Sequence, residues 1–110
     1  MNALDFSKEA IKTLSEYDFI LSIEIQLLDE PVAKIKTVLT GNSFVTIFYN
    51  AETRKTSFAL IKNNKRIYGA DNTKNWHVHP FESPDSHIET EPVILNEFLE
   101  TLSSNRSKWQ

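Results

Sequence analysis

The alternation of apolar and polar residues predicts a series of β-strands through the middle of the chain. Apolar residues stand at every second position from Phe19 to Leu27, and the same period returns from Val32 to Thr40 after Asp29-Glu30-Pro31. A period of two is typical of strands with one buried and one wet face. Residues 43–49 are apolar at both odd and even positions, so we expect a central strand that is covered on both faces.

Tight-turn signals separate these strands and predict how they pair. Gly41-Asn42 and Asn63-Asn64 are residue types that tolerate the positive φ of short hairpin turns. Further strands are predicted from Lys55 to Ile61 and from Lys65 to Ala70, on either side of the second turn. Strands joined by tight turns pair as antiparallel neighbours, so the sequence predicts a meander of about five strands.

Two helices are predicted, one towards each end of the chain. From Ser7 to Tyr17 apolar residues recur at helical spacing, and Ser7 is a suitable N-cap. From Glu91 to Ser103 a clearer stripe recurs at i, i+3, i+4 and i+7, at Leu95, Phe98, Leu99 and Leu102. We expect both helices to pack on one face of the sheet, which gives an α+β fold with a wetter opposite face. Residues 104–110 show no period and are expected to form a flexible, frayed tail.

Composition limits what such a domain can be. With 110 residues, 40% of them hydrophobic, the chain is expected to form a single domain over residues 1–110 with a core that needs no disulfide. Cysteine is absent, which favours a cytoplasmic protein and excludes thiolate metal sites and a cysteine nucleophile. The net charge of -3 gives no overall attraction for nucleic acid, and no apolar run reaches membrane-spanning length.

The periodicity stops in one segment, from Arg66 to His87, which holds all three histidines of the chain. A long ordered segment without a period is usually functional. If the chain is extended around Val78, His77 and His79 point the same way, because alternate side chains share one side of a strand. Asp71 follows the last predicted strand, where a carboxylate can orient an imidazole.

Three interpretations of the histidine pair stay open. Two imidazoles on one side can share a metal ion, with His87 or Asp71 as a third ligand. They can also act as acid and base on an RNA phosphodiester, since histidine titrates near neutral pH. They can instead be loop residues that only hydrogen-bond the backbone. Without cysteine or an evident closed set of four ligands, we expect phosphate chemistry rather than a structural metal, and no cofactor.

Basic and aromatic residues around the histidines indicate how a phosphate substrate would be held. Arg66 can clamp a phosphate, and Tyr68, on the same face of its predicted strand, can stack a base. A structural interpretation competes for each residue, because such side chains also end strands, guard hairpin edges and anchor loops. The expected catalytic residues are His77, His79, Asp71 and Arg66. The expected substrate-binding residues are Tyr68, Asn72, Lys74, Trp76 and His87.

Three segments, Arg66–Asn72, His77–Pro80 and His87–Glu89, together with the amphipathic helix that follows them, resemble the TumE family of small toxins from toxin–antitoxin pairs. The resemblance lies mainly within residues 66–102. It implies a toxin that is neutralised by a helix-turn-helix antitoxin protein and that acts on RNA. The matched positions are Arg66, Asp71, Asn72, His77, His79 and His87.

The leading prediction is therefore a toxin-like protein that acts on RNA through the acid–base pair His77 and His79, without a metal ion. The first alternative is a non-enzymatic interaction module. In it the histidine segment is a structural loop that seats an antitoxin or a second copy in a homodimer, and Leu28 and Val38 join the contact surface. The second alternative is a metal-assisted hydrolase that uses His87 as a further ligand.

Overall fold

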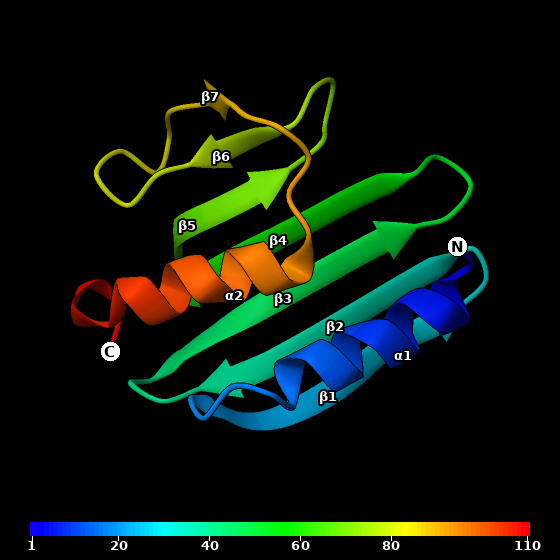
Figure 1. Ribbon diagram of the computed structural model, residues 1–110, viewed down its shortest axis with the longest axis horizontal. Helices are drawn as coiled ribbons and strands as arrows, with labels where there is room; N and C mark the ends of the chain where they lie inside the picture. Colours follow the sequence, from blue (N-terminus) through cyan, green and yellow to red (C-terminus); the bar gives the residue numbers. More distant parts are fainter.

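The computed structural model describes residues 1–110, which form one antiparallel sheet of seven strands and two α-helices (Figure 1). Sequence neighbours are spatial neighbours throughout the sheet, in the order β1-β2-β3-β4-β5-β6-β7. The strands are β1 (Ile20–Asp29), β2 (Val32–Leu39), β3 (Ser43–Asn50), β4 (Lys55–Lys62), β5 (Lys65–Asp71), β6 (His77–His79) and β7 (Ile88–Glu89). The α+β meander is confirmed, with two strands more than expected, because β6 and β7 are too short to show a period.

Both helices lie on the same face of the sheet, as predicted. Helix α1 (Ala3–Leu14) lies in front of β1 and β2, and α2 (Leu95–Ser104) crosses β3 and β4 (Figure 1). The apolar stripe of α2 is buried at all four predicted positions, against inward side chains of the sheet such as Ile47 and Leu60. We call the covered side of the sheet the helix face and the other side the open face.

The tight turns adopt the backbone that their sequence predicts. Gly41 and Asn42 have φ values of 78° and 58°, and Asn63 and Asn64 have values of 53° and 63°. Two consecutive positive φ angles match the right-handed twist of the strands that a two-residue hairpin joins. The two-residue turn Asn63-Asn64 pairs Lys62 with Lys65, whereas three residues, Thr40 to Asn42, separate the register partners Leu39 and Ser43.

The helix boundaries differ from the prediction because the caps are not where the sequence suggested them. The N-cap of α1 is Asn2, whose side chain accepts a hydrogen bond from the Asp5 N–H at 2.8 Å. Ser7, the expected N-cap, is buried inside the helix. Helix α2 begins at Leu95 rather than Glu91, where the Glu97 carboxylate accepts a hydrogen bond from the Ile94 N–H at 3.2 Å.

The C-terminal segment is packed, and the expectation of a frayed tail is wrong. Residues Arg106–Lys108 form the single-turn 3₁₀-helix η1, and Trp109 is only 1% exposed. The Trp109 indole N–H donates to the Leu102 carbonyl at 2.9 Å, and its ring meets Phe19 edge-on at 5.3 Å between centroids. One large aromatic ring at the end of a single turn has no periodicity, yet its burial outweighs the cost of ordering the segment.

Strand β3 is covered on one face only, which corrects the expectation of a doubly buried central strand. Its odd-numbered residues point into the core, whereas Phe44, Phe48 and their even-numbered neighbours are half-buried on the open face. Strand β1 also departs from its predicted half-burial, with Leu21 63%, Ile25 45% and Leu27 41% exposed. Two register shifts interrupt the alternation of this edge strand. Neither helix has the length and apolar character needed to cross a membrane.

Candidate functional site

The histidine segment forms the last two strand pairings of the sheet, and these pairings bring its polar residues together. Across β5 and β6, Asp71 is the register partner of His77, and Gly69 is the partner of His79. The residue between them on β5 is Ala70, which is buried in the core under the helices. Because neighbouring residues of a strand point to opposite faces, Asp71, His77 and His79 lie on the open face.

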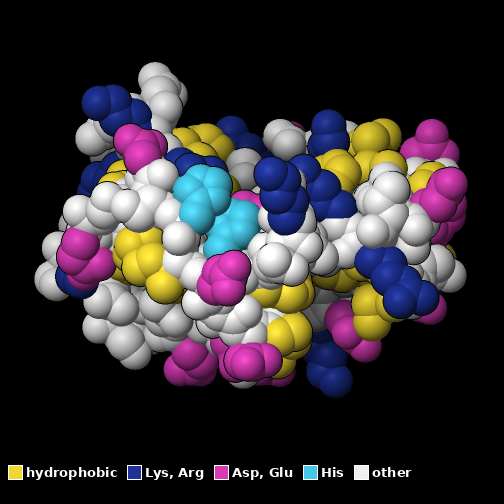
Figure 2. Space-filling view, turned by 90° about the horizontal axis from the view of Figure 1, so that it is seen from above, with side chains coloured by type: hydrophobic (Ala, Val, Ile, Leu, Met, Phe, Trp, Pro, Cys, Tyr) yellow, Lys and Arg dark blue, Asp and Glu magenta, His cyan; other side chains and the backbone are white.

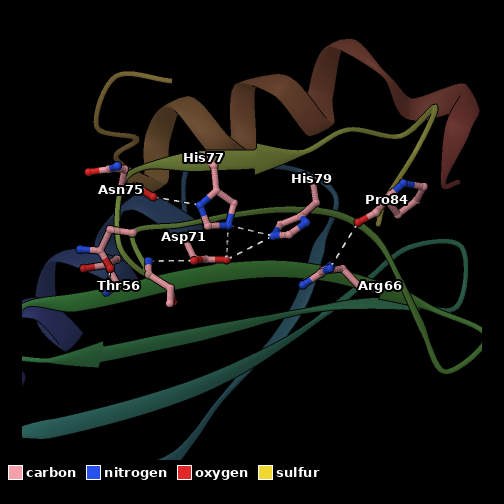
Figure 3. Close-up of polar contacts among 9 residues, drawn as sticks. Thr56, Arg66, Asp71, Asn75, His77, His79 and Pro84 are labelled. Atoms are coloured by element: carbon pink, nitrogen blue, oxygen red, sulfur yellow. Dashed lines mark hydrogen bonds and ion pairs between the residues drawn. The ribbon is translucent and has the colours of Figure 1, made fainter. Parts of the chain in front are cut away.

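The three side chains point toward one another in a closed triangle of polar atoms (Figure 3). The Asp71 Oδ2 atom lies 3.2 Å from His77 Nε2 and 3.3 Å from His79 Nε2. The two Nε2 atoms are 3.2 Å apart. The residues are largely shielded from water, since His77 is 7% and His79 2% exposed. The prediction that the histidines point the same way therefore holds, and Asp71 joins them.

A backbone carbonyl determines which nitrogen of His77 carries the proton. His77 Nδ1 lies 2.9 Å from the Asn75 carbonyl oxygen, which can only accept a hydrogen bond. The Nδ1 atom must therefore be the N–H donor, and in the neutral ring Nε2 keeps a free lone pair. That lone pair faces the Asp71 carboxylate and the other imidazole. A carbonyl contact to the far nitrogen is the usual support of a metal-binding histidine.

His87 completes the group from the loop between β6 and β7. Its ring stacks on His77 at 4.7 Å between centroids and meets His79 edge-on at 4.5 Å. One nitrogen from each of the three imidazoles lies within 4.8 Å of the others. His87 is exposed, and histidine side chains can be seen at the surface at this end of the sheet (Figure 2). We call His77, His79, His87 and Asp71 the histidine cluster.

The cluster lies in a pocket of about 330 Å³ whose lining contains no apolar side chain. Besides the cluster, the pocket is lined by Arg66, Thr73 and Lys74, so two cations stand at its rim. The Lys74 backbone has a φ of 68° in the turn after β5. The pocket therefore combines a group of metal-ligand types with positive charge suited to an anionic ligand.

Burial and neighbouring groups shift the pKa values of His79 and Asp71 towards the forms that bind metal ions. Burial of the ring, and next the Arg66 guanidinium, lower the pKa of His79 below its ordinary value despite the nearby Asp71. Burial alone would raise the pKa of Asp71. However, hydrogen bonds from Thr73, with His77 and His79, bring that pKa below its ordinary value. The Thr73 N–H donates to Asp71 Oδ1 at 2.9 Å, which leaves Oδ2 facing the histidines.

Arg66 reaches the pocket because β5 contains a bulge, and it does not share a face with Tyr68 as expected. Leu60 pairs with Tyr68 but the next residue, Ile61, pairs with Arg66, so Ile67 is an extra residue. Arg66 thus lies on the open face, where its Nη2 donates to the Pro84 carbonyl at 3.3 Å (Figure 3).

Tyr68 points the other way, into the helix face. Its ring stacks on Phe81 at 4.7 Å and contacts Phe98 at 5.4 Å between centroids. Burial raises the pKa of Tyr68 above its ordinary value. We therefore assign Tyr68 to the core, rather than to substrate binding.

Asn72 and Trp76, also expected to bind substrate, lie outside the histidine pocket. The Asn72 side chain joins β5 to the start of β4: it donates to the Arg54 carbonyl at 2.7 Å and accepts from the Thr56 N–H at 2.8 Å. Trp76 lines a separate, mostly apolar pocket between α1 and the segment that leads into α2. Of the expected substrate-binding residues, Lys74 and His87 are in the pocket.

Sequence reasoning missed three residues that shape the cluster, namely Gly69, Thr73 and Asn75. A Cβ on Gly69 would lie 3.0 Å from Arg66 Cδ and 3.6 Å from His79 Cδ2, so the glycine leaves room for both side chains. Thr73 and Asn75 act through a backbone N–H and a backbone carbonyl. Backbone groups carry no sequence signal, whereas a lone glycine in a strand does mark a close approach.

The spacing of the donor atoms fits a metal ion. Zinc bonded at about 2.0–2.1 Å in tetrahedral geometry places neighbouring ligand atoms about 3.3 Å apart. The three edges of the Asp71, His77 and His79 triangle measure 3.2 and 3.3 Å. His87 stands beside the triangle as a fourth donor.

Comparison of the chain with protein-family models, curated proteins and solved structures gives no match. The resemblance to the TumE family, with the toxin role and antitoxin partner that it implies, stays a prediction.

Proposed function

We propose that this protein is a hydrolase of phosphate esters that holds a divalent transition-metal ion in the histidine cluster. His77, His79 and Asp71 are the main ligands, and His87 is a fourth donor on the solvent side. The observation that carries the proposal is the triangle of one carboxylate oxygen and two imidazole nitrogens with edges of 3.2 and 3.3 Å. Imidazole and carboxylate are ligands that zinc and similar divalent ions prefer.

Hydrogen bonding alone satisfies this triangle poorly. Since the Asn75 carbonyl holds the His77 proton on Nδ1, neutral His77 brings only a lone pair to the triangle. Asp71 Oδ2 also brings lone pairs, so one N–H of His79 is left to serve two acceptors. A cation among the three atoms gives each of them a partner, while the buried Nδ1 of His79 has no hydrogen-bond partner with or without the cation. Buried polar groups without a partner cost folding free energy, which favours this arrangement.

The pocket around the cluster suits a phosphate ester. Arg66 and Lys74 bring positive charge to the rim, where they would hold the anionic phosphate. A bound metal ion supplies a nucleophile at neutral pH by lowering the pKa of a bound water. Hydrolysis adds that water across one P–O bond and releases an alcohol, so it needs no further reactant. The exposed side of His87 is where water and substrate would enter.

Acid–base cleavage of RNA without a metal ion is a second candidate, and one contact favours it. The Asp71 carboxylate lies within 3.3 Å of both imidazoles, as required of a group that orients an acid–base pair. In this case Arg66 holds the phosphate and the toxin role implied by the TumE resemblance follows. The two candidates differ in whether a chelator abolishes activity.

Titration of chelator-treated protein with Zn²⁺, followed by calorimetry, tests the metal site. We expect one ion per chain and a weakening of at least about 100-fold in Asp71→Asn, because loss of a direct ligand should cost no less than the loss of a residue that only orients a ligand. Asp29→Asn is the matched control, because it removes an exposed carboxylate at the far end of β1 and should bind Zn²⁺ like the wild type. Equal affinities in both variants, or no binding by the wild type, would sink the metal site.

Hydrolysis of bis(p-nitrophenyl) phosphate tests the reaction. We expect activity that requires added metal ion, and a raised KM in Arg66→Gln with little change in kcat. Activity that survives a chelator but is lost in His79→Gln would instead establish the acid–base candidate. Absence of activity in the presence of Zn²⁺ and Mn²⁺ would contradict the hydrolase.

A further inference from the structure

The open face of the sheet carries two aromatic rings that neither helix covers. Phe44 and Phe48 project from β3 on this side and are half-buried, while both helices lie on the other side. The core does not require these rings, since alternate residues of β3 already fill it. Partly exposed aromatic rings on such a face can stack planar ligands.

Small side chains connect these rings to the histidine cluster. Along one row of register partners, Phe48 faces Ser57, Ser57 faces Asp71, and Asp71 faces His77. The next row runs Thr46, Ala59, Gly69 and His79. With strands about 4.8 Å apart, Phe48 lies about 14 Å from His77 across a floor without large side chains. The floor is thus a continuous path to the pocket.

Positive charge follows the same face, against the net charge of -3 of the chain. Lys34 Nζ lies 6.0 Å from the Phe48 ring centroid, and Lys36 Nζ lies 4.4 Å from that of Phe44. At the other end of the floor, Arg66 and Lys74 stand at the pocket rim. Glu24, the register partner of Lys36, is the acidic side chain beside this path on β1. Cations therefore stand at both ends of the floor, with Glu24 beside one end and Glu89, the register partner of His77, beside the other.

We propose that the open face binds single-stranded nucleic acid and leads it into the histidine pocket. Phe44 and Phe48 stack bases, Lys34 and Lys36 contact phosphates, and the small-residue floor lets the strand lie close to the sheet. We call these two phenylalanines and two lysines the platform. Stacking on aromatic rings combined with a cationic track is the usual basis of such binding. The proposal deepens the proposed function, because it rests on that function for the reaction and names a polynucleotide as its substrate class.

Fluorescence anisotropy with labelled oligo(U) and oligo(dT) tests the platform at several salt concentrations. We expect both strands to bind the wild type, because stacking on aromatic rings and contacts to phosphates are possible with RNA and with DNA. Lys34→Gln with Lys36→Gln should weaken binding at least tenfold and reduce the slope of log K against log salt by about 1.4. Lys8→Gln with Lys12→Gln is the matched control, because it removes two exposed lysines from α1 on the helix face.

Phe48→Leu separates stacking from apolar contact, since leucine keeps much of the apolar area but has no ring. We expect about a tenfold weakening of oligonucleotide binding in this variant. Circular dichroism at low temperature checks that each variant is folded. Equal loss of binding in the platform lysines and the α1 lysines would overturn the proposal, as would a wild type that binds neither oligonucleotide.

Failure of the platform and failure of the metal site give different results. Asp71→Asn should lose Zn²⁺ binding while keeping oligonucleotide binding, because it removes a ligand and no cation. The platform variants should keep Zn²⁺ binding and lose the oligonucleotide. A wild type that binds Zn²⁺ but no oligonucleotide would refute the platform alone.

Discussion

The two faces of the sheet are built from the same strands but serve different purposes. On the helix face, residues such as Phe58 and Ala70 are buried under α1 and α2. One position earlier or later, Ser57 and Asp71 point to the open face, where the chain supplies no cover. The strand period therefore places the core and the candidate site back to back. The packed helix face gives the open face a rigid support, so that ligands from β5 and β6 can be held in place.

Strict alternation of side chains along β5 would place Arg66 on the wrong face of the sheet. Arg66 reaches the open face only because the bulge at Ile67 reverses the side on which it points. Without that extra residue it would lie beneath α2 with Tyr68. A local irregularity of one residue thus assigns a charged side chain to the site rather than to the core.

The largest expected effect on stability comes from comparing two phenylalanines on opposite faces of the sheet. Phe58→Ala should lower the free energy of unfolding by about 3–5 kcal/mol, because it leaves a cavity beside Phe98 in the core. Phe48→Ala should cost about 1 kcal/mol, since its ring is half-exposed and the site can relax. Urea denaturation measures both. Similar losses in the two variants would mean that the open face is part of the core.

Adjacent residues on β5 give a second contrast. Ala70→Val should destabilise the protein by about 1–3 kcal/mol through overpacking, because Ala70 is 1% exposed, and it should leave Zn²⁺ affinity unchanged. Asp71→Asn should show the reverse pattern, with weakened Zn²⁺ binding and a smaller change in the stability of the metal-free protein. Denaturation and calorimetry on both variants check this. Loss of Zn²⁺ affinity in Ala70→Val would show that the faces are coupled.

A substitution in the packed C-terminal segment should lower the stability of the protein without changing ligand binding on the open face. Trp109→Phe removes the hydrogen bond to the Leu102 carbonyl and leaves a cavity where the larger indole ring was buried, so it should cost about 1–3 kcal/mol of stability. Thermal and urea unfolding measure the loss, while oligonucleotide and Zn²⁺ binding should match the wild type. A variant as stable as the wild type would indicate that this end of the chain contributes little.

The smallest effect on stability is expected at Gly69. In Gly69→Ala the new methyl group approaches Arg66 Cδ, the flexible stem of that side chain, and the Phe58 carbonyl at 3.3 Å. The strain is offset by the lower chain entropy of alanine, so the net change should stay within about 0.5 kcal/mol. Displacement of Arg66 should still raise the KM for a phosphodiester. An unchanged KM would argue against a role of Arg66 in substrate binding.

Much of the architecture could be read from local chemistry. The positive-φ turn residues, the period of two in β2 and the apolar stripe of α2 each express a rule that acts over a few neighbours. The predictions failed where distant partners decide. Asn2 rather than Ser7 starts α1, where the Glu30 carboxylate also accepts the Ala3 N–H at 2.7 Å, and Trp109 packs back onto Phe19.

By itself, the sequence determined the meander, the two helices and the gathering of every histidine into one segment. Only the tertiary structure decided that Asp71, His77, His79 and His87 converge, and that they do so on the open face. The physical reason is that a period of two says which residues share a side, but not which side the helices cover. A bulge or a three-residue strand has no period at all. The faces to which its side chains point are therefore set by the strands that it pairs with.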